Sequence, residues 1–169
     1  MQDRTLEPQA RELVQDKIKD IRFALLTSQS PDGDFHTRPM YTHGVDADGS
    51  VWFFTYQDSR KVREVHHKPQ VSLSHADHDA QTYVTLAGTA QEERNQAKMD
   101  ELWIDGLKAW IPEGKYAPHV TLLHVQLHQG EYWDKLGGKF NNLFQLAKAA
   151  ITGQPDRSGH HEQFGREQH

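Results

Sequence analysis

The chain has 169 residues, of which 36% are hydrophobic and 9% aromatic, so its length and composition suit one domain with a modest core. Lys and Arg total 19 and Asp and Glu total 24, which gives a net charge of -5 and argues against a nucleic-acid-binding protein, a class that usually carries a basic surface. Cysteine is absent from the sequence, and this excludes disulfides, thiolate catalysis and cysteine-based zinc sites.

The N-terminal segment "MQDRTLEPQAREL" lacks the apolar stretch of a signal peptide. No run in the sequence approaches the roughly 18 apolar residues needed to cross a bilayer. We therefore expect a cytoplasmic protein with no membrane partner.

The first part of the chain predicts one helix and three strands. The helix is expected over about residues 7–20, where apolar side chains recur at helical spacing. Strands are expected in "RFALLTSQ", "FHTRPMYTHGVD" and "SVWFFTYQ", separated by the turn sequences "SPDGD" and "DADG". Because short loops join antiparallel neighbours, the second and third strands are expected to pair in a meander.

The middle of the chain predicts a short helix between strands. "SRKVREVHHKP" indicates a helix of two to three turns that ends before Pro69. Strands follow at residues 70–77 and 82–93, and Gly88 within the second indicates a bulge or a close backbone approach.

The last part predicts a helix over residues 95–110, a long strand over 119–135 and a final helix over about 140–151. We therefore expect one domain over residues 1–152. The almost entirely polar segment 153–169 is expected to form a flexible tail. About six mostly antiparallel strands with short helices give a mainly β fold, and a small barrel is the simplest closure because it leaves no exposed edges.

Cations gather around the start of the short helix. In the expected meander, Arg38 on the second strand approaches Arg60 and Lys61, which follow Ser59 at the helix start. Arg, Lys, a hydroxyl and free helix N–H groups are the donors that bind a phosphomonoester. The alternative is that Ser59 caps the helix and both cations are solvated, and spacing alone favours this alternative.

Other residue patterns point to no further chemistry. The chain has 12 histidines, but the adjacent pairs point apart and no H-E-x-x-H occurs, so no metal site is expected. Tryptophans in "GLKAWIPEG" and "GEYWDK" suit either core or dimer packing or the cover of a flat heterocycle, and residue type does not separate the two.

The ordered set "HTRPM", "VWFFT", "SRKVREVHHKPQVSL", "YVTLAGTAQ", "WIDGLKAWIPEG" and "GEYWDK" resembles the general stress protein 26 group. That group belongs to the pyridoxamine 5'-phosphate oxidase-like FMN-binding split barrels. The resemblance covers roughly residues 8–150 and implies a split β-barrel homodimer with two FMN sites at the subunit interface.

The resemblance also implies roles for individual residues. It places Arg38, Pro39 and Met40 along the flavin, with Arg38 toward the ribityl chain or phosphate. Phe54 and Thr55 would line the flavin, Ser59, Arg60 and Lys61 would hold the phosphate, Trp133 would cover the ring, and Trp110 would contribute across the interface.

The sequence departs from true pyridoxamine 5'-phosphate oxidases on the substrate side. Those enzymes carry an Arg-Gln pair where this chain has Thr82-Tyr83, and "EYWDKLGGKFNN" replaces their substrate-phosphate segment. Oxidation of pyridoxamine phosphate is therefore not expected. No catalytic acid or base is assigned, although Tyr41, His43 and Tyr83 are candidates to face the ring.

The resemblance thus implies an FMN-dependent oxidoreductase of unknown substrate. The alternatives are a flavin-binding stress or sensor module without dedicated catalysis, and a split barrel that binds haem or a deazaflavin.

Overall fold

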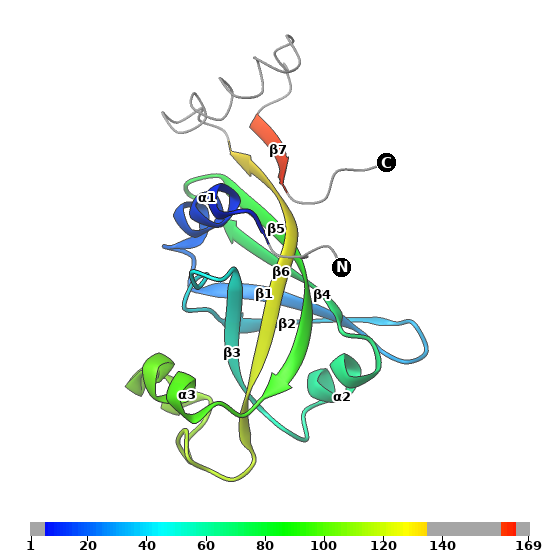
Figure 1. The fold of residues 1–169 in the computed structure, drawn as a ribbon, viewed down its shortest axis with the longest axis vertical. Helices are drawn as coiled ribbons and strands as arrows, with labels where there is room; N and C mark the ends of the chain where they lie inside the picture. The colour runs from blue at the N-terminus through cyan, green and yellow to red at the C-terminus, as the bar shows by residue number, and fades with distance from the viewer. Residues whose placement is uncertain (1–5, 135–159, 165–169) are drawn as a thin grey trace.

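The computed structural model describes residues 6–134 and 160–164 (Figure 1). The elements in chain order are α1 (Pro8–Ile18), β1 (Phe23–Gln29), β2 (Phe35–Tyr41), β3 (Ser50–Tyr56), α2 (Arg60–His67), β4 (Gln70–Asp77), β5 (Thr82–Glu93), α3 (Gln96–Leu102), the 3-10 helix η1 (Asp105–Ala109), β6 (Val120–Asp134) and β7 (His160–Phe164). The predicted final helix over 140–151 lies outside the described residues.

The strands form one antiparallel sheet in the order β2-β1-β4-β5-β6-β3, with β7 added on β6. The sheet curls into a half-barrel that α1, α2 and α3 flank, which confirms the prediction of a mainly β split barrel. The sequence predicts a mobile tail from residue 153, whereas residues 160–164 form β7.

The predicted pairing of the second and third strands is wrong. β2 ends at Tyr41, so residues 42–49 make a connection long enough to carry the chain to the far edge of the sheet. There β3 pairs with β6, from Ser50 opposite Gln126 to Tyr56 opposite Val120. The two strands are therefore the two edges that the curl of the sheet brings toward each other, and α2 follows at the end of β3.

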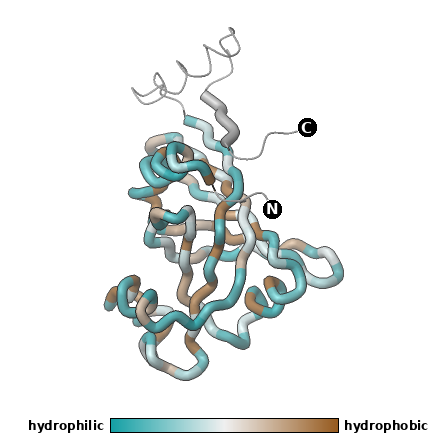
Figure 2. The backbone as a smooth tube through the Cα atoms, viewed as in Figure 1, coloured by the Kyte–Doolittle hydropathy of each residue, from teal (hydrophilic) through white to brown (hydrophobic). Residues whose placement is uncertain are grey.

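Two groups of buried side chains form the core. The larger group fills the inside of the curl and includes the buried face of α1, with Ala10, Val14 and Ile18. The smaller group joins α3 and η1 to the other face of β3 and β6, through side chains such as Met99 and Leu107. Hydrophobic stretches accordingly recur along the strands of the sheet (Figure 2).

Gly88 confirms the expected close approach. The pairing of β5 with β6 shifts register between Ala87 and Gly88. A Cβ atom at Gly88 would lie 2.5 Å from the Gln126 carbonyl oxygen and 2.9 Å from Val125 Cγ1. The absence of a side chain therefore lets the two strands approach at this bulge.

The helix predicted over 95–110 is interrupted. Asn95 caps α3, since its side chain accepts from the Lys98 N–H at 3.0 Å, but the helix ends at Leu102 because Trp103 is extended. The chain resumes as η1, whose Leu107 is buried in the smaller core group. This break positions η1 beside β3.

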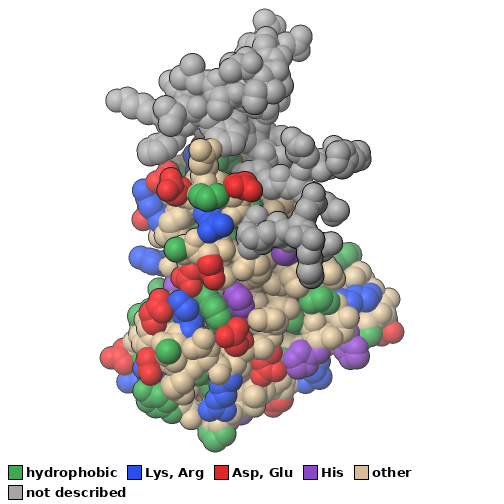
Figure 3. Space-filling model, in the orientation of Figure 1, with side chains coloured by type: hydrophobic (Ala, Val, Ile, Leu, Met, Phe, Trp, Pro, Cys, Tyr) green, Lys and Arg blue, Asp and Glu red, His purple; other side chains and the backbone are tan. Residues whose placement is uncertain are grey.

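The surface gives no sign of a strongly charged face in the view of Figure 3, where acidic and basic side chains are interspersed. Within residues 6–134, none of the helices has the length and apolar content required to cross a membrane.

Candidate functional site

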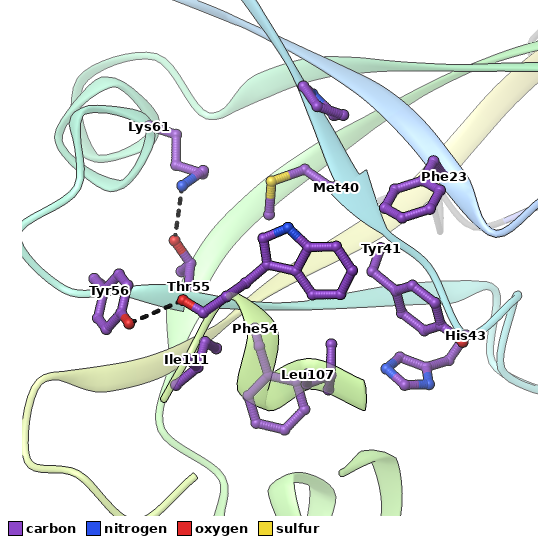
Figure 4. Close-up of a pocket in the computed structure, with 12 residues that line it drawn as sticks. Phe23, Met40, Tyr41, His43, Phe54, Thr55, Tyr56, Lys61, Leu107 and Ile111 are labelled. Atoms are coloured by element: carbon purple, nitrogen blue, oxygen red, sulfur yellow. Dashed lines mark hydrogen bonds between the residues drawn. The ribbon is translucent and has the colours of Figure 1, made fainter. Parts of the chain in front are cut away.

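A pocket lies between the two edge strands and the η1 segment (Figure 4). Its lining comes from β1, β2, β3, the start of α2 and the η1 segment. The lining residues are Phe23, Pro39, Met40, Tyr41, His43, Phe54, Thr55, Tyr56, Lys61, Leu107, Trp110 and Ile111. Aromatic and aliphatic side chains dominate, which is typical of sites for flat organic ligands.

One wall of this pocket is formed by η1 and the two residues that follow it, through Leu107, Trp110 and Ile111. Trp110 follows η1, is 57% exposed, and contacts the edge of Phe23 with ring centroids 5.9 Å apart. The Tyr56 hydroxyl lies 3.1 Å from both the Trp110 carbonyl oxygen and Glu113 Oε2. These contacts fix the segment to the end of β3, so an aromatic side chain stands over the pocket.

One end of the pocket is polar. Lys61 Nζ donates to Thr55 Oγ1 at 2.9 Å (Figure 4). Ser59 Oγ lies 3.3 Å from the same Thr55 atom. Burial, and then the nearby Arg38, lower the pKa of Lys61. Thr121, opposite Thr55 on β6, is buried and its hydroxyl has no hydrogen-bond partner among the described residues.

Ser59 is the N-cap residue of α2, but its side chain makes no capping hydrogen bond. The first backbone N–H groups of a helix have no partner within the helix. The backbone position of Ser59 thus fits the capping alternative, whereas its hydroxyl faces Thr55.

The other end of the pocket carries an imidazole. The His43 ring meets the edge of Tyr41, with ring centroids 5.0 Å apart. Its Nε2 atom is buried and has no hydrogen-bond partner in the described part of the chain. Burial, and then Arg22, lower the pKa of His43, so the imidazole is neutral at pH 7.

Beside the polar end lies a buried carboxylate that sequence reasoning missed. Glu64 on α2 is 3% exposed and forms ion pairs with His36 and Arg38 from β2 and with Arg60. Glu64 stands four residues after Arg60, a spacing that places both side chains on one helix face and was the available signal.

The structure brings together some of the predicted cofactor residues. Those that line the pocket are Pro39, Met40, Phe54, Thr55, Lys61 and Trp110. Ser59 and Arg60 flank its polar end, at 3.3 Å from Thr55 and 3.7 Å from Glu64.

Two predicted cofactor residues lie elsewhere. Arg38 points to Glu64 and Ser28 and does not line the pocket. Trp133 lies near the end of β6, opposite Tyr83 on β5, and is also absent from the lining.

The three residues that the sequence offers as candidates to face the flavin ring are also found in different places. Tyr41 and His43 line the pocket, whereas Tyr83 does not. Sequence reasoning missed Phe23, Tyr56, Leu107 and Ile111, because no spacing rule links strand and loop residues so far apart in the chain. Within the described residues, no three His, Asp or Glu side chains are grouped so that they could hold a metal ion.

A family model described as pyridoxamine 5'-phosphate oxidase like matches residues 9–156. A comparison with curated proteins found no match.

Solved structures share the fold. A protein from Jannaschia sp. CCS1, provisionally named general stress protein 26, has a TM-score of 0.68 and 24% identity over 95% of this chain and 100% of its own. General stress protein 26 from Bacillus anthracis str. Sterne has a TM-score of 0.65 and 19% identity over 73% of this chain and 93% of its own. A general stress FMN/FAD binding protein from the phytopathogen Xanthomonas citri has a TM-score of 0.61 and 24% identity over 73% of this chain and 87% of its own.

Proposed function

The chain belongs to the pyridoxamine 5'-phosphate oxidase-like family, and on that premise we propose that the pocket between β2 and β3 binds FMN in a flavin-dependent oxidoreductase. The family and the Xanthomonas citri neighbour support a flavin. The choice of FMN rests on this chain's own residues.

The polar end suits a phosphomonoester. Lys61 Nζ, the Thr55 and Ser59 hydroxyls and the first N–H groups of α2 are donors from one corner of the pocket. With Arg38 and Arg60 nearby and Glu64 opposing them, two positive charges remain in excess, which matches the roughly -1.5 to -2 charge of a phosphomonoester at pH 7.

The middle of the pocket suits a flat ring. Met40 and Phe54 offer apolar surface from the two edge strands, and Trp110, which follows η1, adds a third apolar side chain to the lining. When bound, the flavin supplies the hydride or electron transfer. This chain's residues hold the phosphate, orient the ring and exclude water from it.

A second copy of the chain completes the proposed site. Phe23 and Leu25 on β1 and Phe35 on β2 are exposed large hydrophobic side chains that point to one face of the hairpin. Exposed apolar side chains on one face of a hairpin are typical of a subunit interface, although the Thr27–Thr37 pair separates Leu25 from Phe35 here. A homodimer would bury that face, and Phe23, which also lines the pocket, would place the site beside the subunit interface.

The charge of the pocket lining limits which substrates are expected. Apart from the neutral His43, only Lys61 among the lining residues is ionisable to a cation, and the cofactor phosphate occupies it. The pocket of one chain therefore offers no second cation for a phosphorylated substrate, which agrees with the expectation that pyridoxamine phosphate is not oxidised. The same observation supports a flavin-binding stress module without dedicated catalysis as the second candidate.

The observation that carries the proposal is the half-buried Lys61 ammonium held at Thr55 at one end of an aromatic pocket. The test is the visible spectrum of concentrated protein after FMN addition and desalting. Retained flavin bands are the expected result, and a colourless protein would refute the proposal. A Soret band would indicate haem, and a preference for a deazaflavin over FMN would indicate that cofactor.

Reduction of the bound flavin separates the two candidates. An oxidoreductase is expected to show bleaching of the flavin bands with NADH or NADPH and reoxidation by an acceptor. Flavin that resists every donor would favour the module without catalysis.

A further inference from the structure

Four aromatic rings in contact line the pocket toward the end opposite Lys61 (Figure 4). The ring of His43 meets that of Tyr41 with centroids 5.0 Å apart, and Tyr41 meets Phe23 at 5.7 Å. Phe23 in turn meets Trp110 at 5.9 Å. All three contacts are edge to face, so the four side chains form one connected surface, which we call the aromatic wall.

His43 contributes a hydrogen-bonding atom that this chain does not use. Its Nε2 is buried and has no hydrogen-bond partner among the described residues. Buried polar atoms are nearly always paired, so one that is not requires an explanation, such as a ligand that pairs with it. A neutral imidazole nitrogen donates or accepts according to its tautomer, and it can therefore pair with a hydroxyl or a carbonyl group.

The charged groups near His43 have opposite signs. Arg22 lowers the pKa of His43 and Asp46 raises it. Neither of them lines the pocket, and the aromatic wall offers no cation or anion of its own. An ionised group bound at this end would lose its water without gaining an opposite charge, so the end favours an uncharged ligand.

Access to the inner part of the aromatic wall depends on its outer rings. Trp110 is 57% exposed and Phe23 is 46% exposed, whereas Tyr41 and His43 are half-buried. Exposed side chains change rotamer on the picosecond to nanosecond timescale. The two outer rings can therefore move aside for a ligand without a change in the core.

We propose that His43 determines the substrate specificity of the site, because its Nε2 pairs with a hydroxyl or carbonyl group of an uncharged, flat substrate that packs against the aromatic wall. This inference rests on the proposed function and names the substrate class of that site. The cofactor phosphate is assigned to the Lys61 end and the flavin ring to the middle of the pocket. The His43 end is therefore assigned to the substrate.

The test compares three probes that share one flat ring system, namely 2-naphthol, naphthalene and 2-naphthoate. Their binding to FMN-loaded protein is measured by equilibrium dialysis at pH 7. Wild type is expected to bind 2-naphthol about three- to tenfold more tightly than naphthalene, the effect of one neutral hydrogen bond. It is expected to bind 2-naphthoate more weakly than 2-naphthol, because the carboxylate finds no cation. Equal affinities for 2-naphthol and naphthalene, or a preference for 2-naphthoate, would overturn the proposal.

The variant His43→Phe keeps a ring beside Tyr41 and removes both nitrogens. It is expected to reduce the preference for 2-naphthol over naphthalene to less than about twofold. Its affinity for FMN, measured by quenching of flavin fluorescence, is expected to stay within about threefold of wild type. The matched control His66→Phe replaces a histidine that is 57% exposed on α2 and outside the pocket lining, and it is expected to keep the wild-type preference.

Two results for the variant would overturn the proposal. One is an unchanged preference for 2-naphthol, and the other is a larger fall in FMN affinity, which would show that His43 contacts the cofactor. If His43→Phe does not fold, His43→Leu also removes the nitrogens and carries the same expected results.

Failure of the proposed function is seen separately. Wild-type protein that binds no FMN would refute that function, and the probes are then measured on cofactor-free protein. A preference for 2-naphthol that His43→Phe removes would still support a ligand site at His43. Absence of that preference would overturn the inference as well.

Discussion

Replacing His75 by leucine is expected to stabilise the protein and to remove part of its acid sensitivity. His75 lies on β4 with 1% of its surface exposed, and neither ring nitrogen has a hydrogen-bond partner among the described residues. Burial lowers the pKa of His75 to about 4, so the ring is neutral in the folded protein at pH 7. A buried N–H without a partner lowers the free energy of unfolding by about 1–3 kcal/mol, and the leucine variant removes this loss. Repacking around leucine offsets part of the gain, by less than about 1.5 kcal/mol.

The pH dependence follows from the direction of that shift. The folded pKa lies below the ordinary value of 6.5, so folding favours the neutral ring. The stability that this ring contributes is complete above about pH 6.5 and is lost as the pH falls toward 4. With these two pKa values, the wild-type protein loses about 2 kcal/mol by pH 5 and about 3 kcal/mol once the pH is well below 4.

The assay is urea unfolding at pH 7.5 and pH 5.0 for wild type, His75→Leu and the control His66→Leu. His66 is 57% exposed on α2, and its replacement serves as the matched histidine-to-leucine change at the surface. The difference between wild type and His75→Leu isolates this one group, since all other titrating groups are shared. Equal losses of unfolding free energy in the two proteins between pH 7.5 and 5.0 would refute the reasoning.

The other predictions concern the bulge and the pocket. Gly88→Ala places a methyl group against the Gln126 carbonyl oxygen and is expected to lower the free energy of unfolding by about 1–3 kcal/mol or more in urea. A change within about 0.5 kcal/mol, the usual scale of neutral surface substitutions, would contradict the close approach. Replacing Arg60 and Lys61 together by alanine is expected to weaken FMN binding by more than about 2 kcal/mol in fluorescence titrations, and unchanged affinity would mean that both cations are merely solvated. Trp110→Ala uncovers the pocket and is expected to increase quenching of bound-flavin fluorescence by added iodide, whereas equal quenching would show that Trp110 does not cover the ring.

Much of the sheet was predictable because its local signals agree. Turn sequences with glycine separate the first three strands, and alternating apolar residues mark β4 and β5. Strand order was not predictable from loop length. β2 ends at Tyr41, so residues 42–49 form a connection that is long enough to reach the other edge of the sheet. The break after Leu102 was equally hidden, since residues 95–110 keep a helical pattern on both sides of it.

The candidate site was predictable only where its residues lie close together in the sequence. Lys61 and Thr55 lie close together in the chain, so their proximity follows from one strand and one helix start. The predicted approach of Arg38 to Arg60 is found, with Glu64 between them. Its reason is that α2 packs on β5 and on β1, the neighbour of β2, and not that β2 and β3 are adjacent. Contacts of this kind depend on tertiary structure, which no local spacing encodes.

The pairing of β3 with β6 also determines when the pocket can exist. β1 and β2 meet through a short turn and need only nearby residues, whereas β3 pairs with residues 120–126, far along the chain. Contacts between such distant segments form slowly, because a long loop must first close. During synthesis on the ribosome, the wall that carries Thr55 therefore has no sheet partner until β6 has emerged. Cofactor loading is thus a late event that follows the assembly of the sheet and cannot guide its earlier steps.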